Sequence, residues 1–264
     1  TFIPHIPYYC PDIPKIIFNQ NFSYTFGPPS MKGGFDVLTP SDVISLYRHP
    51  SIFSVWTVSS HDARAVSDSL PLRPHVSVSR IFNYIDTNIF NFGYSKKRQF
   101  AYMPRKNKRD SEIICSLLNS QDWFKGWKLL PISGLSQNEV SSVFKESVGF
   151  ISTGHPEGFG LPLAEAIISG CLIVGYDGIG GSEIYDLCKP YDVFTPISFR
   201  DFHSFVQGIK NAIHSYDDVN QLSLSSRLFQ ASELVASRYS SSSMINSVAS
   251  ILHSLQNENL LLSC

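Results

Sequence analysis

Short apolar runs alternate with amphipathic stretches along most of the chain. Runs rich in Ile, Val and Phe predict strands at residues 15–19, 52–58, 75–81, 100–103, 127–132, 150–153, 171–176 and 191–194. Helical periodicity predicts helices at residues 42–48, 60–69, 110–119, 137–145, 162–169, 199–214, 221–238 and 241–255. Strands that alternate with helices indicate parallel sheets with right-handed crossovers, so we expect an α/β fold.

The stretch from residue 150 to residue 170 carries the most specific local pattern. An apolar strand leads into a turn freed by Gly158 and Gly160, and Pro162 suits the first turn of a helix that ends at Gly170. The first amides of a helix have no partner within the helix, and they lie at its positive end, which suits a phosphate. These amides belong to Phe159, Gly160 and Leu161.

Two carboxylates accompany this turn, Glu157 before it and Glu165 in the helix. Two glutamates beside a phosphate would repel it, so we expect them to accept hydrogen bonds from vicinal hydroxyls of a ligand. The ordinary alternative is a charge at the helix start and a solvated helix face. For an isolated pair of glutamates at this spacing that alternative is the usual one.

The string EGFGLPLAEA, residues 157–166, is far more specific than the spacing. It resembles the donor-site signature of retaining glycosyltransferases of the GT-B fold, particularly glycosyltransferase family four. The resemblance implies that Glu157 contacts the transferred sugar and that Glu165 contacts the nucleotide ribose. It implies a nucleotide-sugar substrate, a UDP-, GDP- or ADP-sugar, with no cofactor.

A basic segment follows the strand predicted at residues 100–103. We expect its later members to lie in the loop at the carboxyl end of that strand, where open α/β sheets bind ligands. By the resemblance, Arg105 neutralises the donor diphosphate together with a second cation. The family spacing for that cation falls on Asp110, which leaves three candidates: Lys106, Lys108 and Arg109. A solvated basic loop is the alternative, and the lack of interleaved aromatics disfavours a nucleic-acid patch.

Other segments resemble the same family in the right order. ISGLSQNEV, residues 132–140, resembles the segment whose backbone reads the nucleobase, which makes Gly134 and Leu135 candidates for the base pocket. NYIDTNIF, residues 83–90, resembles the interdomain linker, with Tyr84 in place of the usual glycine. GIGGSE resembles the family's G-G-x-x-E with one residue fewer, so Glu183 is either a ligand contact or a structural charge.

His155 lies two residues before Glu157, which suggests a general base. Because a residue before proline is held extended, we favour packing of this ring against the loop. No H-x-x-H, H-E-x-x-H or carboxylate triplet is present, so no metal is expected.

Composition limits the class of protein. The 264 residues carry a formal net charge of -1, with 43% hydrophobic and 16% charged residues, which predicts a globular protein and disfavours a dedicated nucleic-acid binder. Five cysteines without a C-x-x-C pair suggest reduced thiols in the cytoplasm. No apolar run reaches the roughly 20 residues of a membrane span, and peripheral membrane association stays open.

These patterns lead to one architecture and one function. We expect two Rossmann-like domains in the GT-B arrangement: a short or truncated acceptor-side domain with its linker at residues 1–94, a complete donor-binding domain at 95–240, and a C-terminal helix at 241–264 that crosses back. The expected function is transfer of a sugar, with retention, to a hydroxyl acceptor, as in polysaccharide biosynthesis. The alternatives are a non-catalytic nucleotide-sugar-binding module and a GT-B sugar-nucleotide epimerase.

Two further expectations concern the N-terminal part. The chain starts at Thr1 and not at methionine, and three strands are few for a doubly wound domain, which suggests a missing N-terminal segment. Apolar surface left beside the strands at 15–19 and 52–58 would favour association with a partner, such as a second copy of the chain. The pair Gly33 and Gly34 is expected to form a plain turn.

Overall fold

The computed structural model describes residues 13–27, 39–218 and 221–257, so the expected turn at Gly33 and Gly34 lies outside the described residues. The chain divides into two compact units. Unit 1 comprises residues Thr1–Phe82 and Ser242–Cys264, and unit 2 comprises Asn83–Ser241.

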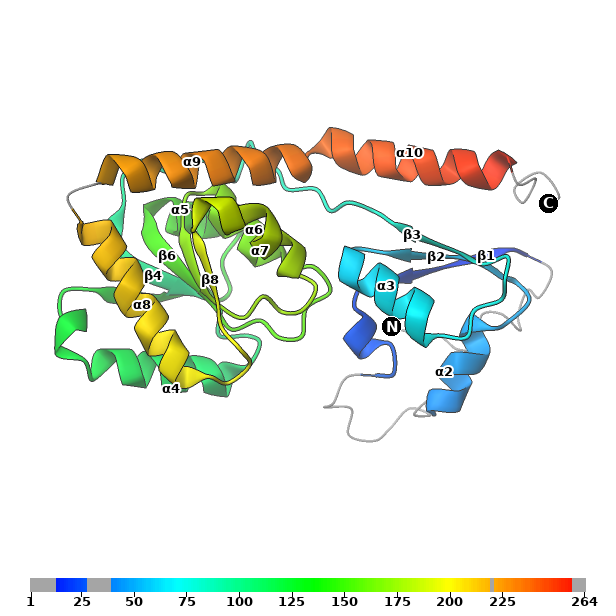
Figure 1. The fold of residues 1–264 in the computed structure, drawn as a ribbon, viewed down its shortest axis with the longest axis horizontal. Coiled ribbons are helices and arrows are strands. Elements are labelled where there is room, and N and C mark those ends of the chain that lie inside the picture. Colours follow the sequence, from blue (N-terminus) through cyan, green and yellow to red (C-terminus); the bar gives the residue numbers. More distant parts are fainter. Residues whose placement is uncertain (1–12, 28–38, 219–220, 258–264) are drawn as a thin grey trace. The chain divides into compact units, whose positions relative to one another are not determined.

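Unit 1 contains a three-stranded parallel sheet in the order β1-β2-β3 (Figure 1). Its described elements are β1 (Lys15–Asn19), η1 (Phe22–Tyr24), α2 (Pro40–Tyr47), β2 (Ile52–Thr57), α3 (Ser60–Ser69), β3 (Ser77–Arg80) and α10 (Ser241–Asn257). Helix α2 starts earlier than the sequence predicted because Thr39 and Asp42 form a reciprocal capping box at its N-terminus.

Apolar side chains cover both faces of this small sheet. Helices α2 and α3 pack on one face, in a cluster that includes Tyr47, Val55 and Val66. Helix α10 packs on the other face, where Ile251 and Leu255 contact Phe53. The last helix of the chain therefore completes the core of unit 1, although it is far from the sheet in sequence.

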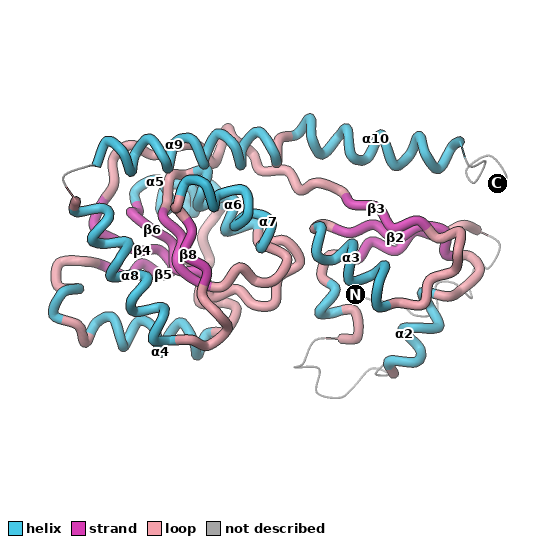
Figure 2. The backbone as a smooth tube through the Cα atoms, in the orientation of Figure 1, coloured by secondary structure: helices cyan, strands magenta, loops and turns pink. Residues whose placement is uncertain are grey.

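Unit 2 contains a five-stranded parallel sheet in the order β5-β4-β6-β7-β8, drawn in magenta in Figure 2. Its strands are β4 (Lys97–Tyr102), β5 (Lys128–Pro131), β6 (Ser147–Ser152), β7 (Leu172–Gly175) and β8 (Phe194–Pro196). Its described helices are α4 (Lys108–Asn119), η2 (Asp122–Phe124), α5 (Gln137–Glu146), α6 (Leu161–Ile168), α7 (Ser182–Cys188), η3 (Lys189–Tyr191), α8 (Phe202–Asp217) and α9 (Gln221–Arg238).

Helices cover both faces of this sheet. Helices α5, α6 and α7 lie on one side, where α9 packs on α6 and α7, and α4 packs with α8 on the other side (Figure 1). Every residue of the central strands β6 and β7 is buried, as expected for strands of a parallel sheet covered on two faces. The expected α/β class with parallel sheets is confirmed.

The strand order reverses once in unit 2. The chain passes from β4 to β5 at one edge, and β6 then enters on the other side of β4. Connections from β4 and β6 therefore leave the sheet in opposite directions, and a crevice opens between them at the carboxyl ends of these strands. This topological switch point is where doubly wound sheets bind ligands.

Two predicted elements of unit 2 are wrong in position. The strand expected at residues 191–194 is instead the end of η3 followed by β8, because Pro190 lies in the 3-10 turn that begins at Lys189 and Asp192 adopts a left-handed conformation with φ 50°. The helix expected from residue 199 begins at Phe202, where the Asp201 side chain caps the amide of Ser204.

Gly175, at the end of β7, provides a test of this packing. Its φ is +145°, and a Cβ there would lie 2.1 Å from the backbone oxygen of Ser152, so neither strand can make room by moving a side chain. We expect Gly175→Ala to lower the free energy of unfolding by about 2 kcal/mol more than Gly126→Ala. Gly126 has a φ of +88° and no atom within 4 Å of such a Cβ, so it controls for backbone strain alone. Urea unfolding measures both, and equal losses would contradict the close approach.

Candidate active site

A cavity lies at the switch point of unit 2. Its walls come from the ends of β4 and β6, from the loops that follow these strands and from the first turn of α6. The residues that line it are Met103, Arg105, Lys106, Phe150, Ser152, Thr153, Gly154, Glu157, Gly160, Pro162 and Leu163. Of the residues singled out from the sequence as catalytic or donor-binding, Arg105, Lys106, Glu157 and Gly160 meet here.

Opposite charges face each other across this cavity. Lys106 Nζ lies 2.6 Å from Glu157 Oε2, and both side chains are about three-quarters buried, with 27% and 23% of their surface exposed. Lys106 Nζ also lies 3.4 Å from the backbone oxygen of Pro156. Partial burial strengthens this ion pair relative to one on the open surface, so the pair holds the two loops in one arrangement.

The start of α6 forms the third wall. Gly160 takes a left-handed conformation with φ 87° at the N-cap, and no side chain caps the helix there. Pro162 occupies the first turn of α6, as predicted. The uncapped start of a helix exposes partial positive charge, so this wall adds to the attraction for an anion.

Glu165 lies on α6 and does not line the cavity. Desolvation by burial raises the pKa of its carboxyl from the ordinary 4.5 to about 7. Burial makes this carboxyl group costly to ionise, and its oxygens can accept hydrogen bonds from a ligand that reaches it.

The remaining predicted residues lie outside the cavity lining. Lys108 and Arg109 do not lie in a loop, because α4 already begins at Lys108; both side chains are 77% exposed and pair with Glu112. Gly134 and the exposed Leu135 lie between β5 and α5, where Gly134 has a φ of +69°.

The turn residues beside Gly160 also differ in exposure. Gly158 is buried, and Leu161 is 43% exposed. Phe159 is buried, with its ring 4.8 Å from that of Tyr239. The Tyr239 hydroxyl donates a hydrogen bond to Glu183, which gives Glu183 a structural contact within unit 2.

His155 packs as predicted. Its ring stacks on Phe199 with the centroids 4.5 Å apart, and it meets Tyr176 edge to face at 6.0 Å. Burial lowers the pKa of the imidazole below its ordinary value, so the ring is neutral at pH 7.

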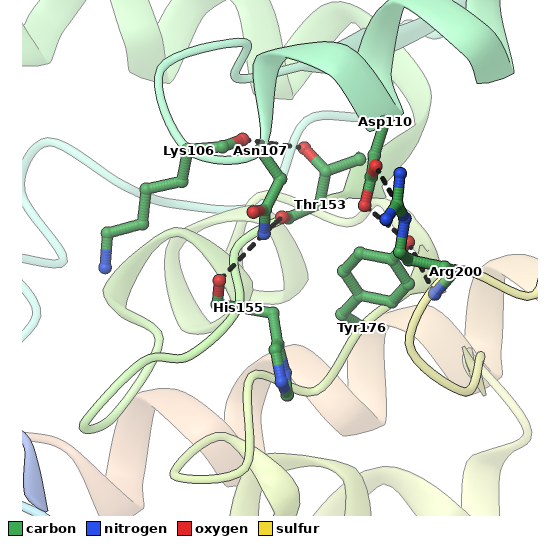
Figure 3. A network of polar contacts seen from close by, with 7 residues as sticks. All are labelled: Lys106, Asn107, Asp110, Thr153, His155, Tyr176 and Arg200. Carbon is green, nitrogen blue, oxygen red and sulfur yellow. Dashed lines mark hydrogen bonds and ion pairs between the residues drawn. The ribbon is translucent and has the colours of Figure 1, made fainter. Parts of the chain in front are cut away.

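Sequence reasoning missed a polar network at this edge of the sheet, shown in Figure 3. The Asn107 amide nitrogen donates to the backbone oxygens of Thr153 and His155, at 2.8 Å each. The signal available in the sequence was an asparagine just before a helix, since asparagine is enriched in the left-handed conformation that residue 107 adopts.

A second group of contacts in Figure 3 joins three other segments. Tyr176 donates to Asp110 Oδ2 at 3.0 Å and accepts from the amide of Arg200 at 2.9 Å, while Arg200 Nε lies 3.5 Å from Asp110 Oδ1. Burial raises the pKa of Tyr176 to about 12. Asp110, where the family spacing would place a cation, is thus buried among polar partners of its own.

The part of the chain that the structure describes holds no cluster of three or more His, Cys, Asp or Glu side chains suited to a metal ion. None of the helices there is both long enough and apolar enough to cross a membrane.

Known proteins resemble this chain in part of its sequence and in its fold. No protein-family model matches the chain. A stretch of 89 residues is 32% identical to an alpha-1,6-glucosyltransferase of Actinobacillus pleuropneumoniae serotype 7; it covers 33% of this chain and 26% of that protein. The chain thus matches about a quarter of its curated relative's length.

Solved structures share the fold. TarM of S. aureus, in complex with Fondaparinux, alpha-GlcNAc-glycerol and UDP, is 13% identical with a TM-score of 0.68, over 90% of this chain and 50% of that one. HepE of Anabaena, in complex with UDP-glucose, is 14% identical with a TM-score of 0.64, over 95% of this chain and 75% of that one. Sucrose-phosphate synthase of Thermosynechococcus elongatus is 8% identical with a TM-score of 0.67, over 92% and 68%. The expected GT-B fold class is confirmed.

The raised pKa of Glu165 predicts how stability depends on pH. Between pH 4.5 and about 7 the folded protein binds more protons at this carboxyl than the unfolded chain does, so the contribution of Glu165 to stability falls as pH rises. We expect Glu165→Gln to match the wild type near pH 4.5 and to exceed its free energy of unfolding at pH 8 by up to about 3 kcal/mol. The exposed Glu233→Gln is the control. A difference between variant and wild type that does not change with pH would contradict the burial of Glu165.

Proposed function

We propose that this chain binds a nucleotide-sugar in the switch-point cavity and transfers the sugar to a hydroxyl of an acceptor, with retention of configuration. The observation that supports it best is the convergence of Arg105, Lys106 and Glu157 on one cavity, beside the uncapped start of α6. Two cations, a helix N-terminus and a single carboxylate suit a ligand that has both anionic and hydroxyl-rich parts.

The reaction breaks the bond between the sugar's anomeric carbon and the diphosphate oxygen and forms a bond from that carbon to the acceptor oxygen, whose proton passes to the departing diphosphate. Negative charge grows on the diphosphate oxygen as the first bond breaks. Positive groups that are already in place stabilise this charge and lower the barrier without rearranging during the reaction. We propose that the charge is stabilised by Arg105, Lys106 and the amides at the start of α6. Lys106 is the second cation in this proposal, because Lys108 and Arg109 pair with Glu112 outside the cavity lining.

The ion pair of Lys106 with Glu157 has a role in binding. A diphosphate near Lys106 offers its ammonium group an alternative anion, and Glu157 is then available for hydroxyl groups of the sugar. The second carboxylate, Glu165, is proposed to accept hydrogen bonds from the ribose. Gly134 and Leu135 are proposed to contact the base, and Gly158, Phe159 and Leu161 to shape the turn around the phosphates.

The comparisons suggest which donor to test first. TarM was crystallised with UDP and HepE with UDP-glucose, and the curated relative is a glucosyltransferase. We therefore propose a UDP-sugar as donor and UDP-glucose as the first ligand to measure. The acceptor is proposed to be a hydroxyl of a growing glycan, and the expectation that unit 1 binds it stays a prediction.

Removing either proposed phosphate contact should weaken the diphosphate specifically. We expect Arg105→Ala and Lys106→Ala each to weaken UDP by about tenfold or more, since a charged hydrogen bond is lost, and to leave the weaker binding of uridine unchanged. Isothermal titration calorimetry at pH 8 measures both ligands. Lys108→Ala is the matched control, because its side chain lies two residues away and is 77% exposed. An equal loss of affinity for UDP and uridine, or a loss of affinity in Lys108→Ala alone, would show that the phosphates do not bind at Arg105 and Lys106.

Glu157 should affect the rate of transfer more than the affinity for the donor. We expect Glu157→Gln to lower turnover of UDP-glucose by at least about tenfold, because a contact that strengthens as charge develops on the sugar is lost. UDP should bind at least as tightly as to the wild type, because Lys106 no longer has to leave an anionic partner. Release of UDP over a panel of glycan acceptors gives the rate. Binding of UDP-glucose without any transfer by the wild-type chain would instead favour a non-catalytic binding module.

A further inference from the structure

We propose that Asn107 is a positioning residue: its side-chain amide ties the loop that carries Lys106 to the loop that carries Glu157, and thereby sets the width of the cavity. This inference rests on the proposed function, since the cavity is taken as the donor site. Asn107 itself does not line the cavity.

The contacts fix how the amide group points. Both acceptors are backbone carbonyl oxygens, of Thr153 and of His155, each 2.8 Å from Asn107 Nδ2. Only the NH₂ end of an amide can donate to two carbonyls, so its orientation follows from chemistry. Both N–H donors of the amide therefore bind the segment 153–155, which ends two residues before Glu157.

The side chain of Asn107 forms hydrogen bonds to the neighbouring loop and none to its own helix. An asparagine at the N-cap usually accepts a hydrogen bond from the helix, which stabilises the helix by about 1 kcal/mol. Asn107 stands at the N-cap of α4 with φ 51° and ψ 48°, and its side chain makes no capping hydrogen bond. The left-handed backbone directs this side chain toward the end of β6 instead of toward its own helix (Figure 3).

Neighbouring contacts converge on the same segment. The hydroxyls of Ser111 and Thr153 lie 2.9 Å apart, and Lys106 approaches both the oxygen of Pro156 and the carboxylate of Glu157. Lys106 is adjacent to Asn107 in the chain, and Glu157 follows the bonded carbonyl of His155 closely. A shift of either loop would therefore change the distance between the two charges.

The Tyr176 network supplies a matched control. It also bridges loops at the carboxyl edge of the sheet, but it joins Asp110 to Arg200 and contacts neither Lys106 nor Glu157 through its hydroxyl. In Figure 3 it lies on the side of Asn107 away from the Lys106 ammonium. Tyr176→Phe should therefore cost stability without opening the cavity.

The test uses Asn107→Gly, which allows the left-handed backbone and removes the whole side chain with its amide. We expect amide hydrogen exchange, measured by mass spectrometry on the unliganded chain, to quicken by about fivefold or more at residues 153–160. We expect the affinity for UDP-glucose, measured by calorimetry, to fall by about tenfold, because the charged groups are no longer held in place. In Tyr176→Phe, exchange at 153–160 and the affinity should both stay within about twofold of the wild type.

A second variant tests the chemistry of the contact. Asn107→Asp keeps the size and the left-handed preference but turns a carboxylate toward two carbonyl oxygens, so it should match Asn107→Gly. Wild-type behaviour of Asn107→Asp would overturn the proposed role of the amide donor.

The remaining outcomes separate this inference from the function on which it rests. If the wild type binds no nucleotide-sugar, the proposed function fails, and the exchange data still test the link between the loops. Unchanged exchange in Asn107→Gly overturns the link. Quickened exchange with unchanged affinity overturns the positioning role, and so does an equal loss of affinity in Tyr176→Phe.

Discussion

The reversal of strand order between β4 and β6 is the constraint on which the site depends. Two parallel strands side by side send their following loops in opposite directions, and the crevice between these loops needs no further structure to form. One loop supplies Arg105 and Lys106, and the other supplies Glu157 and the glycine turn into α6. Topology thus brings residues about fifty positions apart in sequence to one place, and contacts between the two loops set their spacing.

Electrostatics then determines what this crevice can bind. Without a ligand, Lys106 and Glu157 neutralise each other at 2.6 Å, which keeps two partly buried charges from standing alone. The start of α6 adds positive potential without adding a side chain. In a ligand with phosphates and hydroxyls, the phosphates can pair with Lys106 while the hydroxyls donate hydrogen bonds to Glu157. A ligand with only one of these groups would leave one of the two charges without a partner. The proposed nucleotide-sugar has both kinds of group, and a simple anion does not.

Local sequence rules predicted the strand, glycine turn and helix around residues 150–170 because each step depends on one or two residues. Gly160 readily adopts the left-handed conformation of the turn, Pro162 suits the first turn of a helix, and β6 and β7 are short runs in which every residue is buried. The choice among Lys106, Lys108 and Arg109 could not be made in the same way. It depends on where α4 begins, and α4 begins after a left-handed residue whose side chain bonds to a distant strand.

The errors have a similar origin. Residues 191–194 satisfy an apolar strand pattern, but Pro190 and the left-handed Asp192 place the strand later. The desolvation of Glu165 depends on tertiary packing around α6, which no local pattern contains. Short-range conformational rules therefore gave the elements of the sheet, while contacts between loops and between helices determined the details of the site.

A crystal structure of the 264-residue chain with UDP-glucose would show whether the switch-point cavity is the donor site. We expect density for the diphosphate within hydrogen-bonding distance of Arg105 and Lys106, with the sugar hydroxyls on Glu157 and the ion pair of Lys106 with Glu157 broken. A nucleotide bound at the exposed first turn of α4, beside Lys108 and Arg109, with that ion pair intact, would contradict it.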